Sequence, residues 1–156
     1  MSSCRNRLPL AVLRTMQPTR STLLALDVGA KRIGVAASDL ASRLPHPLTT
    51  IDAESNPGEA VQELAVRHGA IGMVIGLPRG LDGQETAQTR TVRDFAEQLK
   101  QHVSLPQYWQ DEAVTSRQAE EELQRRGKPY KKGDIDALSA TYILEDFLRD
   151  HPEVSA

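Results

Sequence analysis

Residues 26–39 read LDVGAKRIGVAASD, and this stretch decides the fold. One apolar run, over residues 23–26, ends at Asp27, and a second apolar run, over residues 33–37, follows after a short link that contains glycine. Two such runs separated by a few residues are typical of a β-hairpin. The stretch therefore predicts two antiparallel strands, with an acidic side chain at the end of the first.

The rest of the chain alternates short apolar runs with amphipathic segments. Further strands are predicted at residues 48–51, 71–75 and 107–110. Apolar spacing and end signals predict helices over residues 57–69, around 92–99, over 115–127 and over 134–149. Because short links join the first three strands and each later strand follows a helix, we expect a meander extended by parallel strands. The prediction is an α/β fold with one mixed five-stranded sheet flanked by helices.

Length and composition limit the alternatives. A chain of 156 residues and 17.2 kDa suits one domain, which we place at residues 21–150. No apolar run approaches the roughly 18 residues that span a bilayer, so we expect no membrane insertion. Cys4 is the only cysteine, which excludes an intrachain disulfide and favours a reducing compartment, the cytoplasm.

Both ends of the chain are predicted to lie outside this domain. Residues 1–20 contain four arginines and no acid. We expect a basic tail that is disordered or not natively translated, since Met16 is an alternative start to Met1. Residues 151–156 are expected to form a C-terminal tail. The whole chain carries a net charge of −2, so the domain without the basic tail is more acidic than that.

Three acidic residues stand where a charge is costly. Asp27 and Glu112 each come at the end of a predicted strand, and sheets form ligand sites beyond the carboxyl ends of their strands. Taken alone, a turn cap for Asp27 and a solvated strand end for Glu112 are equally good interpretations. Asp136 shares the inward face of the last helix with Ala140 and Ile143, where a carboxylate must be paired or bind a metal.

Three carboxylates brought together repel one another unless a cation lies between them. Their hard oxygen atoms favour Mg²⁺ or Mn²⁺. Such a site can hold two ions, which activate a water molecule and stabilise the leaving oxygen of a phosphodiester. The pattern predicts phosphodiester hydrolysis without a protein nucleophile. The four histidines have no zinc-ligand spacing, and the sequence has no serine-hydrolase elbow.

A dense basic strip precedes the last helix and consists of Arg125, Arg126, Lys128, Tyr130, Lys131 and Lys132. In an otherwise acidic domain such a strip attracts a polyanion. We interpret it as a mobile phosphate-binding loop in which Tyr130 can stack on a base. A solvated connection between two helices is the alternative.

Residues near the strand ends are candidates for substrate contact. Gly29, Lys31 and Arg32 follow Asp27, where a glycine lets a substrate approach and two cations can meet phosphates. Solvated hairpin charges explain the two cations equally well. Arg79 follows the strand at residues 71–75 and is expected to contact a phosphate.

Other residues are expected to support the site or the fold. Asp39 and Asp111 are assigned supporting roles near the carboxylates, with a turn cap as the alternative for Asp39. Asp134 is expected to be the N-cap of the last helix. Trp109 is expected to lie in the core.

Taken together, the motifs resemble the YqgF (RuvX) family. The stretch over residues 26–39 is similar to that family's opening motif. Three further blocks match in order, namely VIGLP at 74–78, WQDE at 109–112 and IDALSA at 135–140. The resemblance covers about residues 21–150. It departs from the family pattern at residues 113–116, which read AVTS in place of an arginine and a threonine pair.

The resemblance implies an RNase H-like fold and either a pre-16S rRNA nuclease or a Holliday junction resolvase. It carries the family's catalytic acids onto Asp27, Glu112 and Asp136. It favours RNA, at the 5′ end of pre-16S rRNA, over four-way DNA junctions, whose paired cleavage requires a dimer. The chain is accordingly expected to be a monomer or a homodimer. Weaker alternatives are an actin-like ATPase, for which one domain is too small, and a catalytically silent nucleic-acid-binding module.

Overall fold

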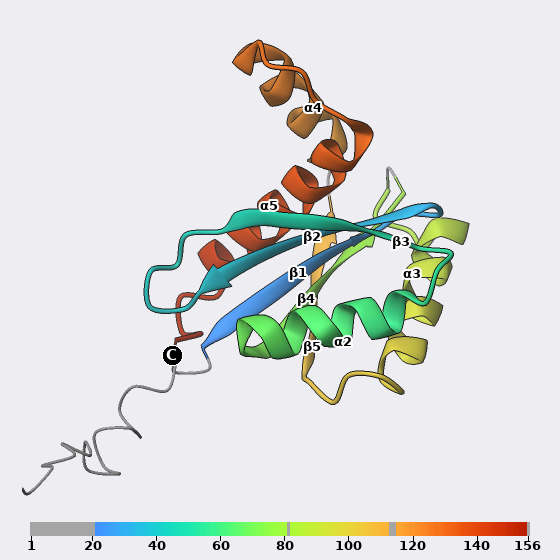
Figure 1. Ribbon diagram of the computed structural model, residues 1–156. Coiled ribbons are helices and arrows are strands. Elements are labelled where there is room, and N and C mark those ends of the chain that lie inside the picture. The colour runs from blue at the N-terminus through green and yellow to red at the C-terminus, as the bar shows by residue number, and fades with distance from the viewer. Residues whose placement is uncertain (1–20, 81, 113–114, 156) are drawn as a thin grey trace, which may run out of the picture.

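Five strands build one mixed sheet (Figure 1). The structure, a computed structural model, describes residues 21–80, 82–112 and 115–155. The strands are β1 (Thr22–Val28), β2 (Arg32–Asp39), β3 (His46–Asp52), β4 (Ala70–Pro78) and β5 (Gln107–Glu112). Their order is β3-β2-β1-β4-β5, with β1–β2 and β2–β3 antiparallel and β1–β4 and β4–β5 parallel. The predicted meander and both parallel pairings are confirmed.

Helices cover both faces of the sheet. Figure 1 shows α2 (Pro57–His68) and α3 (Ala87–Leu99) on one face and α5 (Lys132–Asp150) across the other, while α4 (Thr115–Arg126) projects from the body. α2 begins at the predicted Pro57 and ends before Gly69, whose φ of 63° lies in the left-handed region that glycine adopts without strain. A capping box of Thr86 and Thr89 starts α3.

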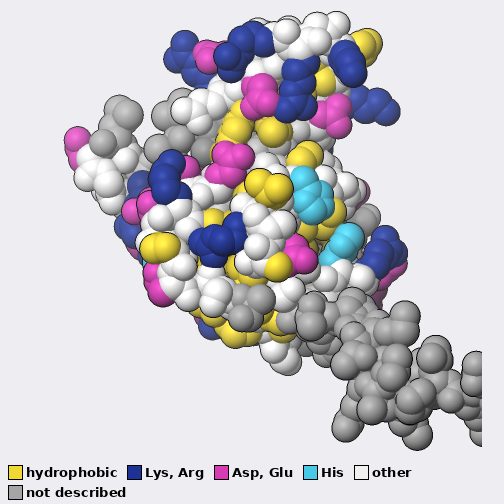
Figure 2. All heavy atoms as spheres, turned by 90° about the vertical axis from the view of Figure 1, so that its left-hand side faces the viewer, with side chains coloured by type: hydrophobic (Ala, Val, Ile, Leu, Met, Phe, Trp, Pro, Cys, Tyr) yellow, Lys and Arg dark blue, Asp and Glu magenta, His cyan; other side chains and the backbone are white. Residues whose placement is uncertain are grey.

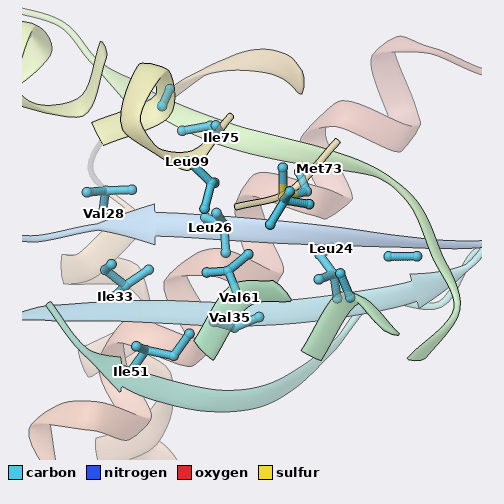
Figure 3. Packing of buried hydrophobic residues seen from close by; sticks show 14 of the residues in the cluster. Leu24, Leu26, Val28, Ile33, Val35, Ile51, Val61, Met73, Ile75 and Leu99 are labelled. Atoms are coloured by element: carbon cyan, nitrogen blue, oxygen red, sulfur yellow. The ribbon is translucent and has the colours of Figure 1, made fainter. Parts of the chain in front are cut away.

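Alternation along β1 separates two hydrophobic clusters. Leu24 and Leu26 belong to the cluster that packs beneath α2 and α3 (Figure 3). Leu23 and Ala25 belong to the cluster that packs against α5. Burying a leucine stabilises the fold by about 1.5–3 kcal/mol. Asp27 continues the second series, so it faces α5.

The start of α5 lies directly on β2 because Gly34 has no side chain. A Cβ atom at this position would overlap the carbonyl oxygen of Asp136. The hydroxyl of Thr50 on β3 also donates to the carbonyl oxygen of Gly133, at 2.6 Å. These contacts fix the height of α5 above the sheet, and with it the position of Asp136.

The other end of α5 is held by Arg43, from the turn between β2 and β3. Its guanidinium donates to the carbonyl oxygens of Leu148, at 2.7 Å, and of Val154. Carbonyl groups at the end of a helix lack intrahelical donors, so this contact satisfies them. Nothing near Arg43 in the sequence predicts it, since the partners lie 105 and 111 residues further on.

Two predictions about the start of α5 are wrong. Asp134 is not the N-cap, because the helix begins at Lys132 and the Asp134 carboxylate accepts from the backbone N–H of Lys131, at 2.8 Å. The basic strip is also not a single loop. Arg125 and Arg126 form the last turn of α4, and Lys132 is the first residue of α5.

Trp109 is not a core residue, contrary to expectation. It lies on the edge strand β5, where 37% of its surface is exposed. The guanidinium carbon of Arg93 lies 5.4 Å from the centre of its ring. Since an edge strand has a neighbour on one side only, large side chains there are less completely covered.

The sequence predicts a tail at each end of the chain. The basic tail predicted for residues 1–20 falls outside the part of the chain that the structure describes. After α5 ends at Asp150, Val154 packs against the cluster on the α5 side of the sheet. Among the described helices, none is long and apolar enough to cross a lipid bilayer.

Candidate active site

The fold brings three acidic residues to the α5 side of the sheet. Asp27 shares its face of β1 with the residues that pack against α5. Glu112 ends β5 on the face of Gln110, whose side chain donates to Asp150 of α5 at 3.2 Å. Asp136 reaches the same region from the first turns of α5 itself.

Gly76, on β4, opens the space between two of these acids. β4 lies between β1 and β5 in the sheet. A Cβ atom at position 76 would lie 3.3 Å from Oε2 of Glu112 and 2.5 Å from Cδ1 of Ile143. Because glycine places no side chain there, the carboxyl groups of Asp27 and Glu112 can meet across the strand.

The carboxyl group of Asp27 is electrostatically strained. Burial, the negative charges of Glu112 and Asp136, and a hydrogen bond with the Glu112 side chain raise the pKa of Asp27 to about 8. Without a bound cation, Asp27 is therefore mostly protonated at neutral pH and donates to Glu112. A cation in this position would replace the proton.

Asp136 is engaged by a basic residue from β2. The Nε atom of Arg32 donates to Oδ2 of Asp136 at 2.7 Å, and the two side chains are 41% and 21% exposed. Within residues 21–80, 82–112 and 115–155, no three acidic, histidine or cysteine side chains already surround one ion position. The guanidinium of Arg32 thus neutralises the third carboxylate in this arrangement.

The donor chemistry of the three acids fits a hard divalent cation. Carboxylates offer only oxygen ligands, which Mg²⁺ and Mn²⁺ prefer. Burial, followed by the charges of Glu112 and Asp136, raises the pKa of Asp27, so the surrounding protein does not compensate the ionised form of this side chain. For all three carboxylates to bind one cation, the Asp136 side chain must move from the position described here, and the exposure of its ion pair with Arg32 permits this.

Arg79 and Asp111 lie at the same edge of the sheet, on the opposite face. Asp111 alternates with Glu112 along β5 and is 75% exposed. Its Oδ1 accepts from Nε of Arg79 at 3.3 Å. Asp111 therefore supports Arg79 rather than the carboxylates, and Arg79 stands at the end of β4 on the α3 side.

Asp39 is far from the carboxylates, so its predicted supporting role is wrong. It pairs with Thr22, at the opposite end of β1 from Asp27, about 17 Å away along the strand. Its carboxylate accepts from the backbone N–H of Ala41 at 2.7 Å, which makes it a turn cap. The physical reason is topological, because β2 runs antiparallel to β1 and ends where β1 begins.

Gly29 and Lys31 shape the turn that follows Asp27. The backbone N–H of Gly29 donates to the carbonyl oxygen of Arg32 at 2.9 Å. A Cβ atom at Gly29 would lie 2.7 Å from that oxygen, so the tight turn requires glycine. Lys31 is exposed in this turn, open to solvent as a phosphate contact requires.

The basic strip gathers around the projecting end of α4. Figure 2 shows Lys and Arg side chains concentrated at that end of the molecule. Arg126 pairs with Glu122 one turn earlier in α4, whereas Lys128 and Lys131 are exposed between the two helices. Tyr130 is partly buried, so only part of its ring surface is open for stacking.

Two residues that shape the site were not expected from the sequence. Gly76 interrupts an apolar strand, and an isolated glycine there indicates close approach of another group, which is the signal that reveals it. Gln88, at the start of α3, donates from Nε2 to the carbonyl oxygen of Val28 at 3.2 Å and so anchors the end of β1. No local sequence signal marks Gln88, because its partner belongs to a different element.

Comparison with known proteins finds relatives over most of the chain. A family model described as "RuvX: Holliday junction resolvase" matches residues 21–150. A Thiobacillus denitrificans protein named "Putative pre-16S rRNA nuclease" is 42% identical over 133 residues, which cover 83% of this chain and 92% of the relative. A protein of the same name from Chloroflexus aurantiacus is 42% identical over 131 residues, covering 81% and 85%.

Solved structures share the fold at low sequence identity. T. thermophilus RuvC in complex with a Holliday junction substrate has a TM-score of 0.53 and 16% identity, covering 83% of this chain and 96% of that chain. The Fowlpox virus resolvase in complex with Holliday junction DNA has a TM-score of 0.51 and 12% identity, covering 86% and 99%. At these identities the likeness concerns the fold alone.

The fold is that of an RNase H-like protein. The family match and the curated relatives show that the protein is a nuclease, an enzyme that hydrolyses phosphodiester bonds. The chain belongs to the RuvX family. The predicted fold class and the resemblance seen in the sequence motifs are thereby confirmed. The identity of the catalytic residues stays a prediction that rests on the geometry above.

Proposed function

We propose that this nuclease depends on a divalent metal and acts on RNA, at the 5′ end of pre-16S rRNA. The observation that carries the proposal is the group of Asp27, Glu112 and Asp136, in which burial and neighbouring negative charge raise the pKa of Asp27 to about 8. Relatives named for pre-16S rRNA favour RNA as the substrate. A divalent cation held by these carboxylates would supply a Lewis acid that activates the attacking water and stabilises the leaving oxygen.

The protein groups have separate tasks around this chemistry. Asp27 and Glu112 project from the ends of two strands of one sheet, so their carboxylates are held rigidly. Asp136 completes the set from α5 once it leaves Arg32. The guanidinium of Arg32 is then free to bind a phosphate oxygen, for which its planar donors are suited. Lys31 adds positive charge on the side where substrate approaches.

Cleavage of four-way DNA junctions is the second candidate. The description of the matching family model favours it. Resolution of a junction needs two cuts placed symmetrically, so this function requires two copies of the chain.

A cleavage panel tests both candidates. Labelled single-stranded RNA, a structured pre-16S rRNA fragment and a four-way DNA junction are each incubated with Mg²⁺, Mn²⁺ or EDTA. We expect cleavage of the rRNA fragment with either metal and none in EDTA. Cleavage of the junction alone, by a protein that sediments as a dimer, contradicts the RNA assignment. Cleavage in EDTA contradicts the metal dependence.

Arg32→Gln is expected to lower the melting temperature without metal and to enlarge the gain in stability from Mn²⁺. Asp136 then loses its counter-ion, so repulsion in the metal-free protein grows, while a cation no longer competes with the guanidinium. Thermal melts with and without Mn²⁺ measure both effects. Arg79→Gln is the matched control, because Arg79 pairs with Asp111 on the other face of the sheet. If Mn²⁺ stabilises Arg32→Gln no more than it stabilises wild type, the guanidinium of Arg32 does not compete with a cation for Asp136.

Replacing Lys128, Lys131 and Lys132 together by alanine is expected to weaken RNA binding for all sequences alike. Each lysine that meets a phosphate releases about one counter-ion, so the slope of log affinity against log salt should fall by up to about three units. Fluorescence anisotropy over a salt series measures the slope. If the slope is unchanged, this part of the basic strip is only a solvated connection.

A further inference from the structure

A groove of about 750 Å³ opens between the edge strand β3, the helix α4 and the first turns of α5. Its lining includes Thr49 of β3, Leu123 of α4 and Leu138 of α5. Arg32, whose guanidinium binds Asp136, is also part of the lining, so the groove is continuous with the candidate active site. We call this feature the β3–α4 groove.

The lining of the β3–α4 groove is basic. It contains Arg32, Arg126 and Lys131 but a single acid, Asp134, whose carboxylate is engaged with the backbone N–H of Lys131 at the start of α5. The ion pair of Arg126 with α4 is half exposed, and such pairs contribute at most about 1 kcal/mol, so a phosphate can replace it. By contrast, two hollows beside Arg67 on α2 are lined by more acids than bases. The groove therefore suits a polyanion.

Apolar side chains lie between these charges. Leu123 is only partly buried in the lining, and Leu138 is also part of it. In a double helix the faces of the bases are stacked on one another, so leucine side chains in a groove would find little to contact. In an unpaired strand the faces are open, and proteins bind such strands by combining basic groups for the backbone with apolar surfaces for the bases.

We propose that the β3–α4 groove binds a short unpaired segment of the substrate strand, next to the bond that is cut. The inference rests on the proposed nuclease function and adds the substrate class to it. The substrate is a nucleic acid with a single-stranded stretch at the cleavage site, not a continuous duplex. The segment leaves the carboxylates past Arg32 and runs between β3 and the end of α4 that carries the basic strip.

Pro47 of β3 allows a test in both directions, because it is exposed in the lining, pairs with Ala36 on the α5 side of the sheet, and belongs to neither the carboxylate group nor the basic strip. Binding of a fluorescein-labelled single-stranded RNA of mixed sequence is measured in EDTA, where no metal-dependent cleavage occurs. We expect Pro47→Lys to bind more tightly and to steepen the salt slope by about one unit, and Pro47→Glu to do the opposite. A blunt RNA duplex of the same sequence should bind all three proteins alike.

Gln62→Glu is the control for the added negative charge, since Gln62 is exposed on α2, across the sheet from the groove. This variant should leave RNA binding unchanged.

Equal changes for single strand and duplex overturn the proposal, because the groove then acts only through its general charge. A changed oligomeric state in Pro47→Glu with unaltered RNA binding also overturns it and makes the groove a protein interface. If wild type cleaves RNA while both Pro47 variants bind RNA as wild type does, the groove proposal is wrong and the nuclease function stands. If no substrate is cleaved while the two variants still shift single-strand binding in opposite directions, the proposed nuclease function is wrong and the groove proposal stands.

Discussion

Replacement of Asp27 by asparagine is expected to abolish cleavage and, at the same time, to stabilise the metal-free protein at alkaline pH. Asparagine keeps the shape of the side chain and its hydrogen bond to Glu112 but removes one of three negative charges. Cleavage is lost because a cation loses an anionic ligand held at the end of β1. Stability is gained because the charge that is removed is the one that burial and its neighbours disfavour.

The pH dependence has a definite sign. In the folded protein the pKa of Asp27 is about 8, against an ordinary value of 3.8. Between these two values the unfolded chain has lost the proton that the folded protein keeps, so stability falls as the pH rises. The fall from this one group is at most about 1.4 kcal/mol per pH unit. Wild type and Asp27→Asn should therefore be similar near pH 4, and the variant should be the more stable near pH 8.

Denaturant unfolding across this pH range, in EDTA and in Mn²⁺, measures the effect. Wild type should gain stability from Mn²⁺ by mass action, and Asp27→Asn should gain less. Asp39→Asn is the matched control, since it makes the same chemical change at the far end of the sheet, where the asparagine oxygen can still accept from the backbone N–H of Ala41. Full cleavage together with an undiminished Mn²⁺ gain in Asp27→Asn would falsify the site.

Gly34→Ala is expected to be the most damaging single-methyl change in the sheet. The added Cβ would overlap the carbonyl oxygen of Asp136, and a backbone atom cannot turn aside as a side chain does. α5 must therefore rise from β2 along the whole contact. We expect a loss of about 3 kcal/mol or more in the free energy of unfolding and a melting temperature lower by about 6–12 °C. Cleavage should fall steeply because Asp136 moves with the helix.

Two measurements separate this explanation from a general intolerance of alanine. Gly80→Ala adds the same methyl group where it meets mainly the flexible side chain of Gln84, so it should cost little stability. The Mn²⁺ gain of Gly34→Ala should be smaller than that of wild type even at temperatures where both are folded, because one carboxylate is displaced. A Gly34→Ala protein with wild-type stability and Mn²⁺ response would show that α5 is not seated on β2.

Local patterns were sufficient for much of the fold. The hairpin, the order of elements and the limits of α2 follow from period-two runs, helical spacing and end residues such as Pro57 and Gly69. The wrong predictions share a different origin. Trp109 was assigned to the core from its size, but its exposure depends on β5 being an edge strand, a property of the assembled sheet. Asp39 was placed near the carboxylates, although the antiparallel course of β2 carries it to the opposite end.

The sequence by itself determined the sheet, its family and the three acids worth examining, because strand periodicity, strand ends and a charge on an apolar helix face are all local patterns. Only the tertiary structure decided how those acids interact. Asp27 is hydrogen-bonded to Glu112 because Gly76 leaves room across β4, and Asp136 is held by Arg32, 104 residues earlier in the chain. Such relations depend on distances between elements and on atoms that glycine lacks, and no spacing along one chain encodes them.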